Sequence, residues 1–246
     1  MKTIGLLGGM SWESSHEYHR LVNEGVREAL GGWHSARLVL YSVDFDEVKR
    51  LQHESRWDEA AALLVAAGKA VERAGADVVL LCTNTMHKVA DQVAAGLSIP
   101  LLHLADATAA AVRSAGTGRV GLLGTAFTME QGFYADRLAR HGLDVLVPEA
   151  ADRELVHRII YDELVLGEVR EESRQAYRGV MDRLVAAGAE GIILGCTEIE
   201  LLVGADDASV PVFPTTRLHA EAAVAYAVGT APLPEPPALD RSASGA

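Results

Sequence analysis

The chain has 246 residues, of which 49% are hydrophobic and 23% are charged, and its formal net charge is −12 at pH 7. These values are typical of a folded globular protein with one large domain or two small ones. The acidic balance argues against binding to nucleic acid or to anionic membranes, because neutralising phosphates takes clustered Lys and Arg. Because no apolar run has membrane-spanning length and no signal peptide is evident, we expect a cytoplasmic protein without a disulfide.

In the first half of the chain, short apolar runs alternate with longer segments of helical periodicity. We predict strands at 2–7, 37–43 and 99–104, a further strand that ends just before Thr83, and helices at 14–30, 58–73 and 85–95. The apolar side chains of the second strand predict that it is buried. Pro100 indicates that the short strand near 99–104 starts there or lies at an edge of its sheet.

The second half of the chain repeats this plan. We predict strands near 119–124, 143–147, 191–195 and 210–213, and helices near 127–141, 152–165, 173–187 and 216–228. Strands and helices that alternate in this way form parallel sheets with right-handed crossovers. The predicted fold is α/β, with two similar parallel-sheet domains: residues 1–104 plus about 215–229 form the first, and residues 105–214 form the second. Residues 230–246 are predicted to be a disordered tail.

One segment with chemically active residues occurs twice. Residues 74–84 align without a gap on residues 187–197, and the glycine turn after the first strand of each half recurs as well. We interpret the chain as two copies of one α/β unit. Copies of this kind pack about an approximate two-fold axis, so that corresponding loops face each other across a cleft. In that arrangement the residue opposite Cys196 is Thr83.

A thiol, a hydroxyl and a carboxylate, at Cys196, Thr197 and Glu198, follow a buried apolar run. They therefore lie at the carboxyl end of a parallel strand, where open α/β sheets bind their ligands. A thiolate at the start of a helix is stabilised by backbone N–H groups, so we expect a lowered pKa for Cys196. Across the cleft, Thr83 and Asn84 offer hydrogen-bond donors for carboxylates. Without a cofactor motif, the simplest reaction is removal and return of a proton at a carbon next to a carboxylate.

Other motifs do not indicate a cofactor or a metal. The glycines of the first turn lack the spacing of a dinucleotide-binding motif and the Lys-Ser/Thr of a phosphate loop. The two histidines within residues 16–19 are one residue too close for a zincin helix, and no third ligand is evident, so we expect no metal. For His87 and His219, which follow strand ends, we favour a packed or surface role.

Four segments together form a recognisable set: Gly8-Gly9-Met10-Ser11-Trp12-Glu13-Ser14-Ser15, Cys82-Thr83-Asn84-Thr85-Met86-His87-Lys88, Leu123-Gly124-Thr125 with Thr128-Met129-Glu130-Gln131, and Gly195-Cys196-Thr197-Glu198-Ile199. They resemble the cofactor-independent aspartate/glutamate racemase family, most closely its broad-specificity or L-aspartate/glutamate-specific bacterial branch. The resemblance covers residues 1 to about 229. It implies a site between two α/β domains, a dicarboxylic amino-acid substrate, no pyridoxal phosphate, no metal and a homodimer. It also implies that one thiol removes the α-proton and a second thiol returns a proton to the opposite face.

The chain departs from this family pattern at the first thiol. Thr83-Asn84-Thr85 stands where most family members have Cys-Asn-Thr, and the L-specific branch is similar in having the same Thr. Cys82 is not an obvious substitute, because a shift of one residue along a strand points the side chain to the opposite face. We therefore expect a buried core thiol at Cys82, and we predict Cys196 as the effective acid/base group. Thr83, or a water that it positions, serves the other face poorly, so turnover should depend on the enantiomer supplied.

The resemblance also implies a set of substrate contacts: Met10, Gln52, Asn84, Thr85, Thr125, Thr197 and Glu198. Some family members hold the distal carboxylate with an Arg and a Lys. Neither can be placed securely here, because the segment 164–167 is apolar, so aspartate, glutamate and other amino acids stay open as substrates.

Three alternatives to a racemase are compatible with these residues. A single thiol in the second half also suits an isomerase or a decarboxylase of the same superfamily that protonates a planar intermediate from one face. The chain could instead be a catalytically silent amino-acid-binding protein. A thiol hydrolase fits less well, because no histidine is reliably placed beside Cys196.

Overall fold

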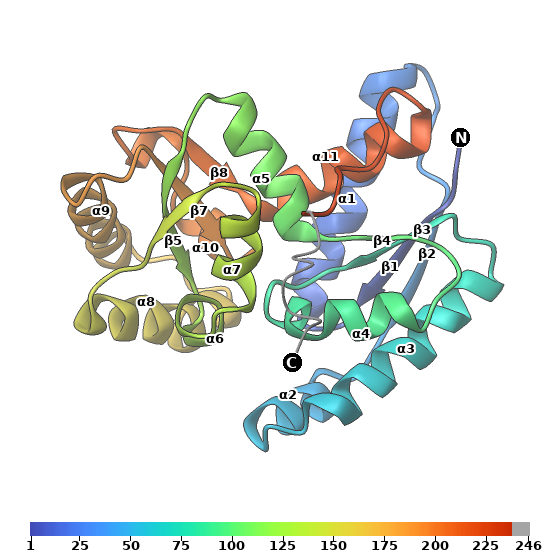
Figure 1. Ribbon diagram of the computed structural model, residues 1–246, viewed down its shortest axis with the longest axis horizontal. Coiled ribbons are helices and arrows are strands. Elements are labelled where there is room, and N and C mark those ends of the chain that lie inside the picture. Colours follow the sequence, from blue (N-terminus) through green and yellow to red (C-terminus); the bar gives the residue numbers. More distant parts are fainter. Residues whose placement is uncertain (238–246) are drawn as a thin grey trace, which may run out of the picture.

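The computed structural model describes residues 1–237 and contains two four-stranded parallel sheets, each flanked by helices (Figure 1). The predicted α/β class with two parallel-sheet units is confirmed. Most of the predicted tail at 230–246 lies outside the described residues, and its described part, 230–237, contains no helix or strand. In the part of the chain that the structure describes, no helix combines the length and the apolar character that crossing a membrane requires.

The first sheet has the strand order β2-β1-β3-β4. Its strands are β1 (Ile4–Gly8), β2 (Leu38–Ser42), β3 (Val78–Leu81) and β4 (Leu101–Leu102), and its helices are α1 (Trp12–Leu30), α2 (Phe45–His53), α3 (Trp57–Arg73), the 3₁₀ helix η1 (Thr85–Val89) and α4 (Ala90–Ala95). In β1, Leu7 packs with α2 and α3, whereas Ile4 and Leu6 pack with α1 and the last helix, α11 (Thr215–Val228). Both faces of the sheet are thus covered, as parallel sheets require.

The second sheet has the equivalent strand order, β6-β5-β7-β8. Its strands are β5 (Arg119–Gly124), β6 (Asp144–Leu146), β7 (Gly191–Gly195) and β8 (Val212–Pro214), and its helices are α6 (Ala126–Glu130), α7 (Phe133–Arg140), α8 (Ala150–Asp162), η2 (Leu164–Leu166), α9 (Glu171–Ala186), α10 (Ile199–Leu202) and η3 (Ala205–Asp207). In β5, Leu123 packs with α8 and α9, whereas Val120 and Leu122 pack with α7 and α5 (Leu104–Ser114). The matching strand orders confirm the repeat that the sequence predicts.

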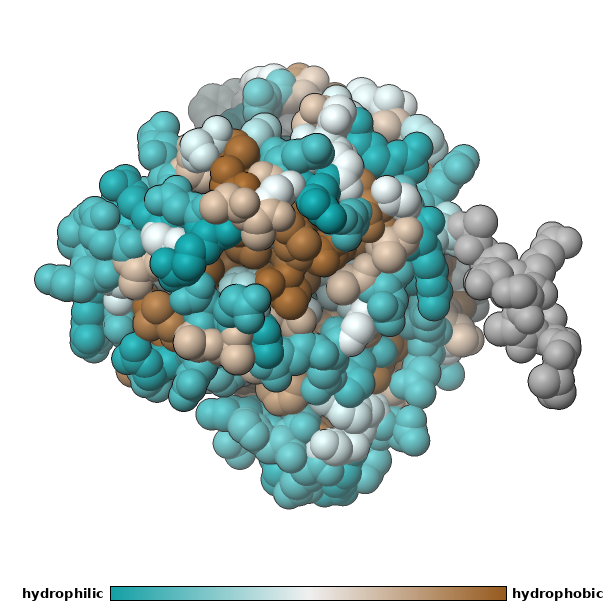
Figure 2. Space-filling model, turned by 60° about the vertical axis from the view of Figure 1, so that its left-hand side comes forward, coloured by the Kyte–Doolittle hydropathy of each residue, from teal (hydrophilic) through white to brown (hydrophobic). Residues whose placement is uncertain are grey.

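Two long helices carry the chain between the two sheets (Figure 1). After β4 the chain enters α5, which packs on the second sheet, and after β8 it returns through α11, which packs against α1. Figure 2 shows one face of the molecule, where hydrophilic side chains cover most of the surface and apolar ones gather in a hollow near the centre.

The structure corrects three local predictions. Strand β2 is not buried, because it is an edge strand of its sheet, and Leu40 and Tyr41 are 41% and 44% exposed. The helix predicted near 127–141 is interrupted between α6 and α7, where Gln131 has an extended backbone. Helices α2 and α5 were not predicted: α2 is short and buries only three residues, and α5 follows β4 after a single residue, His103, which caps it.

Candidate active site

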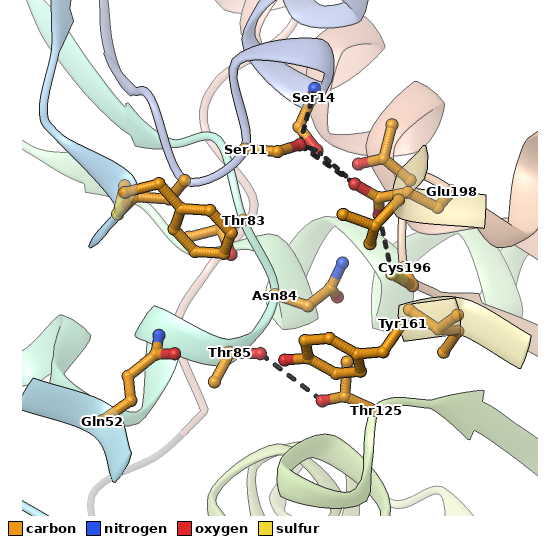
Figure 3. A pocket seen from close by; sticks show the side chains of 16 residues that line it. Ser11, Ser14, Gln52, Thr83, Asn84, Thr85, Thr125, Tyr161, Cys196 and Glu198 are labelled. Atoms are coloured by element: carbon orange, nitrogen blue, oxygen red, sulfur yellow. Dashed lines mark hydrogen bonds between the residues drawn. The ribbon is translucent and has the colours of Figure 1, made fainter. Parts of the chain in front are cut away.

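The candidate active site is a pocket between the two sheets, at the carboxyl ends of their central strands (Figure 3). Met10, Thr83, Thr125 and Cys196 come within two residues of the ends of β1, β3, β5 and β7, respectively. The cavity measures about 540 Å³ when the open space at its mouth is included. Since parallel strands present their carboxyl ends at one edge, the repeat brings two such edges together around one ligand site.

All nine site residues expected from the sequence line this pocket: Met10, Gln52, Thr83, Asn84, Thr85, Thr125, Cys196, Thr197 and Glu198. Six further side chains line the pocket and were not expected from the sequence: Ser11, Ser14, Phe45, Ile160, Tyr161 and Val165. A usable signal existed for the two serines, because they follow a glycine turn at a strand end. The residues from α8 and the turn after it have no such local signal, since only the packing of the second half brings them to the pocket.

The turn after β1 depends on a glycine. Gly9 has a φ of +91°, and a Cβ at this position would lie 2.2 Å from the carbonyl oxygen of Val43. The Gly9 N–H donates to Ser15 Oγ at 2.7 Å. This tight turn delivers Ser11 to the pocket, where its side chain also caps α1.

One wall of the pocket holds a thiol and a carboxylate in direct contact. Cys196 Sγ donates to Glu198 Oε2 at 2.8 Å. The other carboxylate oxygen, Oε1, accepts from Ser11 Oγ at 3.0 Å and from Ser14 Oγ at 3.4 Å. The serines belong to the first half of the chain and the carboxylate to the second, so this network joins the halves. The network also fixes the orientation of the carboxylate, so that, among the described residues, Oε2 accepts only from the thiol.

The expectation of a lowered pKa for Cys196 is wrong. Burial raises the pKa of this thiol well above its usual value, and the adjacent Glu198 raises it further through its charge and by accepting the S–H hydrogen bond. Backbone N–H groups of Glu198 and Ile199 act in the opposite direction with a smaller effect. The helix that follows is only 4 residues long, so it offers little dipole. Cys196 therefore rests as a neutral thiol that can donate a proton.

Thr83 lies on the opposite wall from Cys196, with Asn84 between them (Figure 3). Its neighbour Cys82 does not line the pocket. The Cys82 side chain is fully buried in the core with Leu6 and Leu80, and burial raises its pKa. This position confirms the prediction of a core thiol and follows from the alternation of side chains along an extended chain.

Two buried histidines have ring centroids 5.8 Å apart, and one of them, His87, supports the turn that holds Thr83. His87 Nδ1 donates to the carbonyl of Thr83 at 2.7 Å, and its Nε2 accepts from the first backbone N–H of α5. His219 accepts from the Tyr18 hydroxyl at 2.7 Å and donates to the carbonyl of Leu102 at 3.0 Å. Burial lowers the pKa of His87 to about 3 and that of His219 to about 4. Both rings are therefore neutral and fixed, which confirms a packing role.

The remaining polar groups of the pocket come from both halves of the chain. The hydroxyls of Thr85 and Thr125 lie 3.5 Å apart, and the hydroxyl of Thr197 lies 2.8 Å from that of Thr216. The Asn84 amide lies 3.3 Å from a hydroxyl at the start of α11. Hydroxyl and amide groups that converge in this way are suited to bind a carboxylate through several hydrogen bonds.

The fold and the pocket together place polar side chains of two repeated α/β units around one cavity. Within residues 1–237, no group of three or more His, Cys, Asp or Glu side chains is arranged to hold a metal ion. A family model described as Asp/Glu/hydantoin racemase matches residues 7–223. The chain belongs to this family, and the membership supports isomerase activity of the racemase type on an amino acid.

Comparisons over nearly the whole chain agree with this membership. A solved structure described as a candidate Asp/Glu racemase, from Yersinia pestis, is 56% identical, covers 93% of this chain and all of its own, and superimposes with a TM-score of 0.89. An aspartate racemase homologue from Pyrococcus horikoshii OT3 is 34% identical over the same shares of the two chains, with a TM-score of 0.84. The broad specificity amino-acid racemase RacX of Bacillus subtilis is 21% identical over 90% of this chain and 96% of its own.

Proposed function

We propose that the protein interconverts the L and D forms of an α-amino acid by moving the α-proton between opposite faces of the substrate, without pyridoxal phosphate. The supporting observation is the Cys196 thiol, hydrogen-bonded to Glu198 at 2.8 Å and facing Thr83 across the pocket. Aspartate, and then glutamate, are the first substrates to test, as the resemblance predicts. One relative is named for aspartate and another for broad specificity. The family name alone therefore does not identify the side chain of the substrate.

In this proposal, Cys196 transfers the proton on one face of the substrate. To act as a base, the thiol first passes its proton to Glu198 Oε2, and the thiolate then takes the α-proton as the C–H bond breaks. To act as an acid, the neutral thiol donates its proton to the planar carbanion, and the thiolate that remains recovers a proton from solvent. The carboxylate thus lets a thiol with a raised pKa act as a base, whereas the raised pKa itself keeps the thiol protonated and able to act as an acid.

Thr83 serves the opposite face. Its hydroxyl, or a water that the hydroxyl holds, donates a proton to the carbanion and then recovers a proton from solvent. A threonine hydroxyl is a far weaker base than a thiolate, so the direction that begins with proton removal on this face is slow. The turnover at saturating substrate, kcat, therefore depends on the enantiomer supplied. The ratio kcat/KM does not, because a catalyst leaves the equilibrium constant between the two enantiomers unchanged.

The α-carboxylate is held in this proposal by Asn84, Thr85, Thr125 and Thr197. When the α-proton leaves, negative charge spreads from the α-carbon onto the carboxylate, so donors aimed at its oxygens stabilise the transition state more than the ground state. These groups come from both halves of the chain. The substrate therefore has to bridge the two units, with its α-carbon between Thr83 and Cys196.

The proposal is tested with the purified protein and single enantiomers in heavy water, without added cofactor. Deuterium at the α-carbon is followed by NMR, and chirality is followed by chiral chromatography. Deuterated product of the opposite hand supports racemisation. Deuterated starting material alone would mean that one base works, and loss of carbon dioxide would indicate a decarboxylase.

The matched variant for this test is Cys196→Ser, which keeps a polar group of similar size but lacks the thiol. Racemisation that survives this change at the wild-type rate would overturn the role given to Cys196. The homodimer that the resemblance implies is a separate proposal, and light scattering of the purified protein tests it.

A further inference from the structure

The side chains that line the pocket contain a single formal charge. Among the 16 lining residues within the described part of the chain, Glu198 is the one carboxylate, and none is Lys, Arg or His. The rest are hydroxyls, amides, a thiol and apolar groups. A substrate enters a site whose fixed charge is negative or, once Glu198 holds a proton, neutral.

Two basic side chains on elements beside the pocket, Lys88 and His157, have partners outside it. Lys88 follows the turn that holds Thr83, but its Nζ donates to Gln131 at 2.7 Å and lies 3.9 Å from the ring centroid of Trp57. His157 on α8 is kept neutral, because burial lowers its pKa and its Nδ1 accepts from the Ala126 N–H at 3.1 Å. Neither side chain lines the cavity.

The walls away from the Ser11–Glu198 network are apolar with polar tips. Phe45, Ile160 and Val165 contribute apolar surface, and Gln52 and Tyr161 contribute an amide and a hydroxyl. In Figure 3, Gln52 lies on the side of the pocket away from Glu198, and the ring of Tyr161 points toward Thr85. A substrate side chain that points to this region meets groups that can solvate an amide, a hydroxyl or a thioether, with no cation to neutralise a carboxylate.

We propose that the substrate side chain is uncharged: the pocket selects a neutral amino acid over aspartate and glutamate. This inference rests on the proposed racemase function of the same site. A second, distal carboxylate would lose its hydration without gaining a counter-ion, and an ionised carboxylate buried in this way is strongly disfavoured. The charge of Glu198 adds repulsion, which is stronger inside a pocket than in water. An amide of the same shape avoids both penalties.

Two pairs of substrates separate charge from shape, since asparagine matches aspartate and glutamine matches glutamate. We expect wild-type protein in heavy water to exchange the α-proton of each amide with a kcat/KM at least about tenfold higher than that of the matching acid, because only the acid buries an unpaired charge. Alanine and methionine extend the panel of neutral substrates. A higher kcat/KM for the acids would overturn the inference and leave the racemase function standing. No exchange on any of these amino acids would overturn the racemase function, and the inference with it.

A charge introduced into the apolar wall supplies the second test. Val165→Lys puts an ammonium group where the wall is apolar, so the ratio of amide to acid kcat/KM should fall by about tenfold or more. Val165→Met is the matched control, since it is long and flexible without a charge, and should keep the wild-type ratio. An unchanged ratio in a Val165→Lys protein that still exchanges the amides would contradict this position for the substrate side chain. If that variant does not fold, the amide-to-acid ratios of kcat/KM measured on the wild-type protein are sufficient to test the inference.

Discussion

The segments after β3 and β7 occupy equivalent positions in the two copies of one unit, yet their chemistry differs. After β7, Cys196 donates to the carboxylate of Glu198 at 2.8 Å. After β3, Thr83 offers a hydroxyl, and the nearest histidine, His87, is neutral and holds the backbone of the turn. Strand order and strand direction are the same in both sheets. The scaffold therefore fixes the positions of these two side chains, and in the proposed mechanism the chemistry of each side chain sets how well it transfers a proton.

The largest effect is expected from Cys196→Ala. In either direction, racemisation removes a proton from one face of the substrate and adds a proton to the other, so it always uses the Cys196 face. Loss of the thiol should therefore lower α-proton exchange and inversion of both enantiomers by about 10³-fold or more. Deuterium incorporation in heavy water measures the change. Exchange that persists on one enantiomer would mean that the Thr83 face works without the Cys196 face.

Glu198→Gln should lower the same rates by about 10- to 100-fold, because the amide cannot accept the thiol proton. The reactivity of the Cys196 thiol should nevertheless increase in this variant, because its pKa should fall. The charge of Glu198 and its hydrogen bond raise this pKa, so their removal should lower it and increase alkylation of the thiol at a given pH. The pH profile of iodoacetamide labelling measures this shift. A pKa that stays constant or rises would contradict the coupling of the two groups.

Thr83→Cys makes the two strand ends alike and should reduce the asymmetry. The kcat of the slow enantiomer should rise by about tenfold or more, because a thiol replaces a much weaker acid/base group. Thr83→Ser is the matched control, since it keeps the hydroxyl and should keep the ratio of the two rates. Initial rates from each enantiomer at saturating concentration, measured by chiral chromatography, give this ratio of kcat values. An unchanged ratio in Thr83→Cys would place position 83 outside the reacting geometry.

The repeat explains how much of the site could be predicted. Because residues 74–84 align on 187–197, the sequence alone predicts that Thr83 faces Cys196 and that Cys82 points away, and the structure places both side chains so. Tyr161 could not be found in this way. It lies on the helix after β6, and its place in the pocket depends on how the two halves pack.

The pKa of Cys196 shows a second limit of reasoning from local sequence. A thiol at the start of a helix suggests stabilisation of the thiolate, but the helix is one turn long and the side chain is buried beside a carboxylate. Burial is a property of the whole fold. The exposure of β2 was missed for the same reason, because an apolar run does not show whether its strand is central or at an edge.

The buried, neutral His87 should make stability depend on pH. The pKa of His87 is about 3 in the folded protein, against 6.5 in an unfolded chain. The unfolded state therefore binds more protons below pH 6.5, and the free energy of unfolding decreases as the pH falls toward 4. This one group contributes at most about 1.4 kcal/mol per pH unit. His87→Gln should reduce the slope measured by urea denaturation at pH 7 and 5, whereas His16→Gln, on the exposed surface of α1, should keep it.

The smallest effect on activity is expected from Cys82→Ala, although this residue is the neighbour of Thr83. The Cys82 side chain lies in the core between β3 and α1, so its removal leaves a small cavity that should lower the free energy of unfolding by about 1 kcal/mol. Initial rates from both enantiomers should stay within about twofold of wild type, because no proton-transfer group is lost. Urea denaturation and chiral chromatography on one preparation separate the two effects. A loss of activity as large as that of Cys196→Ala, with stability unchanged, would mean that the thiol at 82 and not the hydroxyl at 83 opposes Cys196.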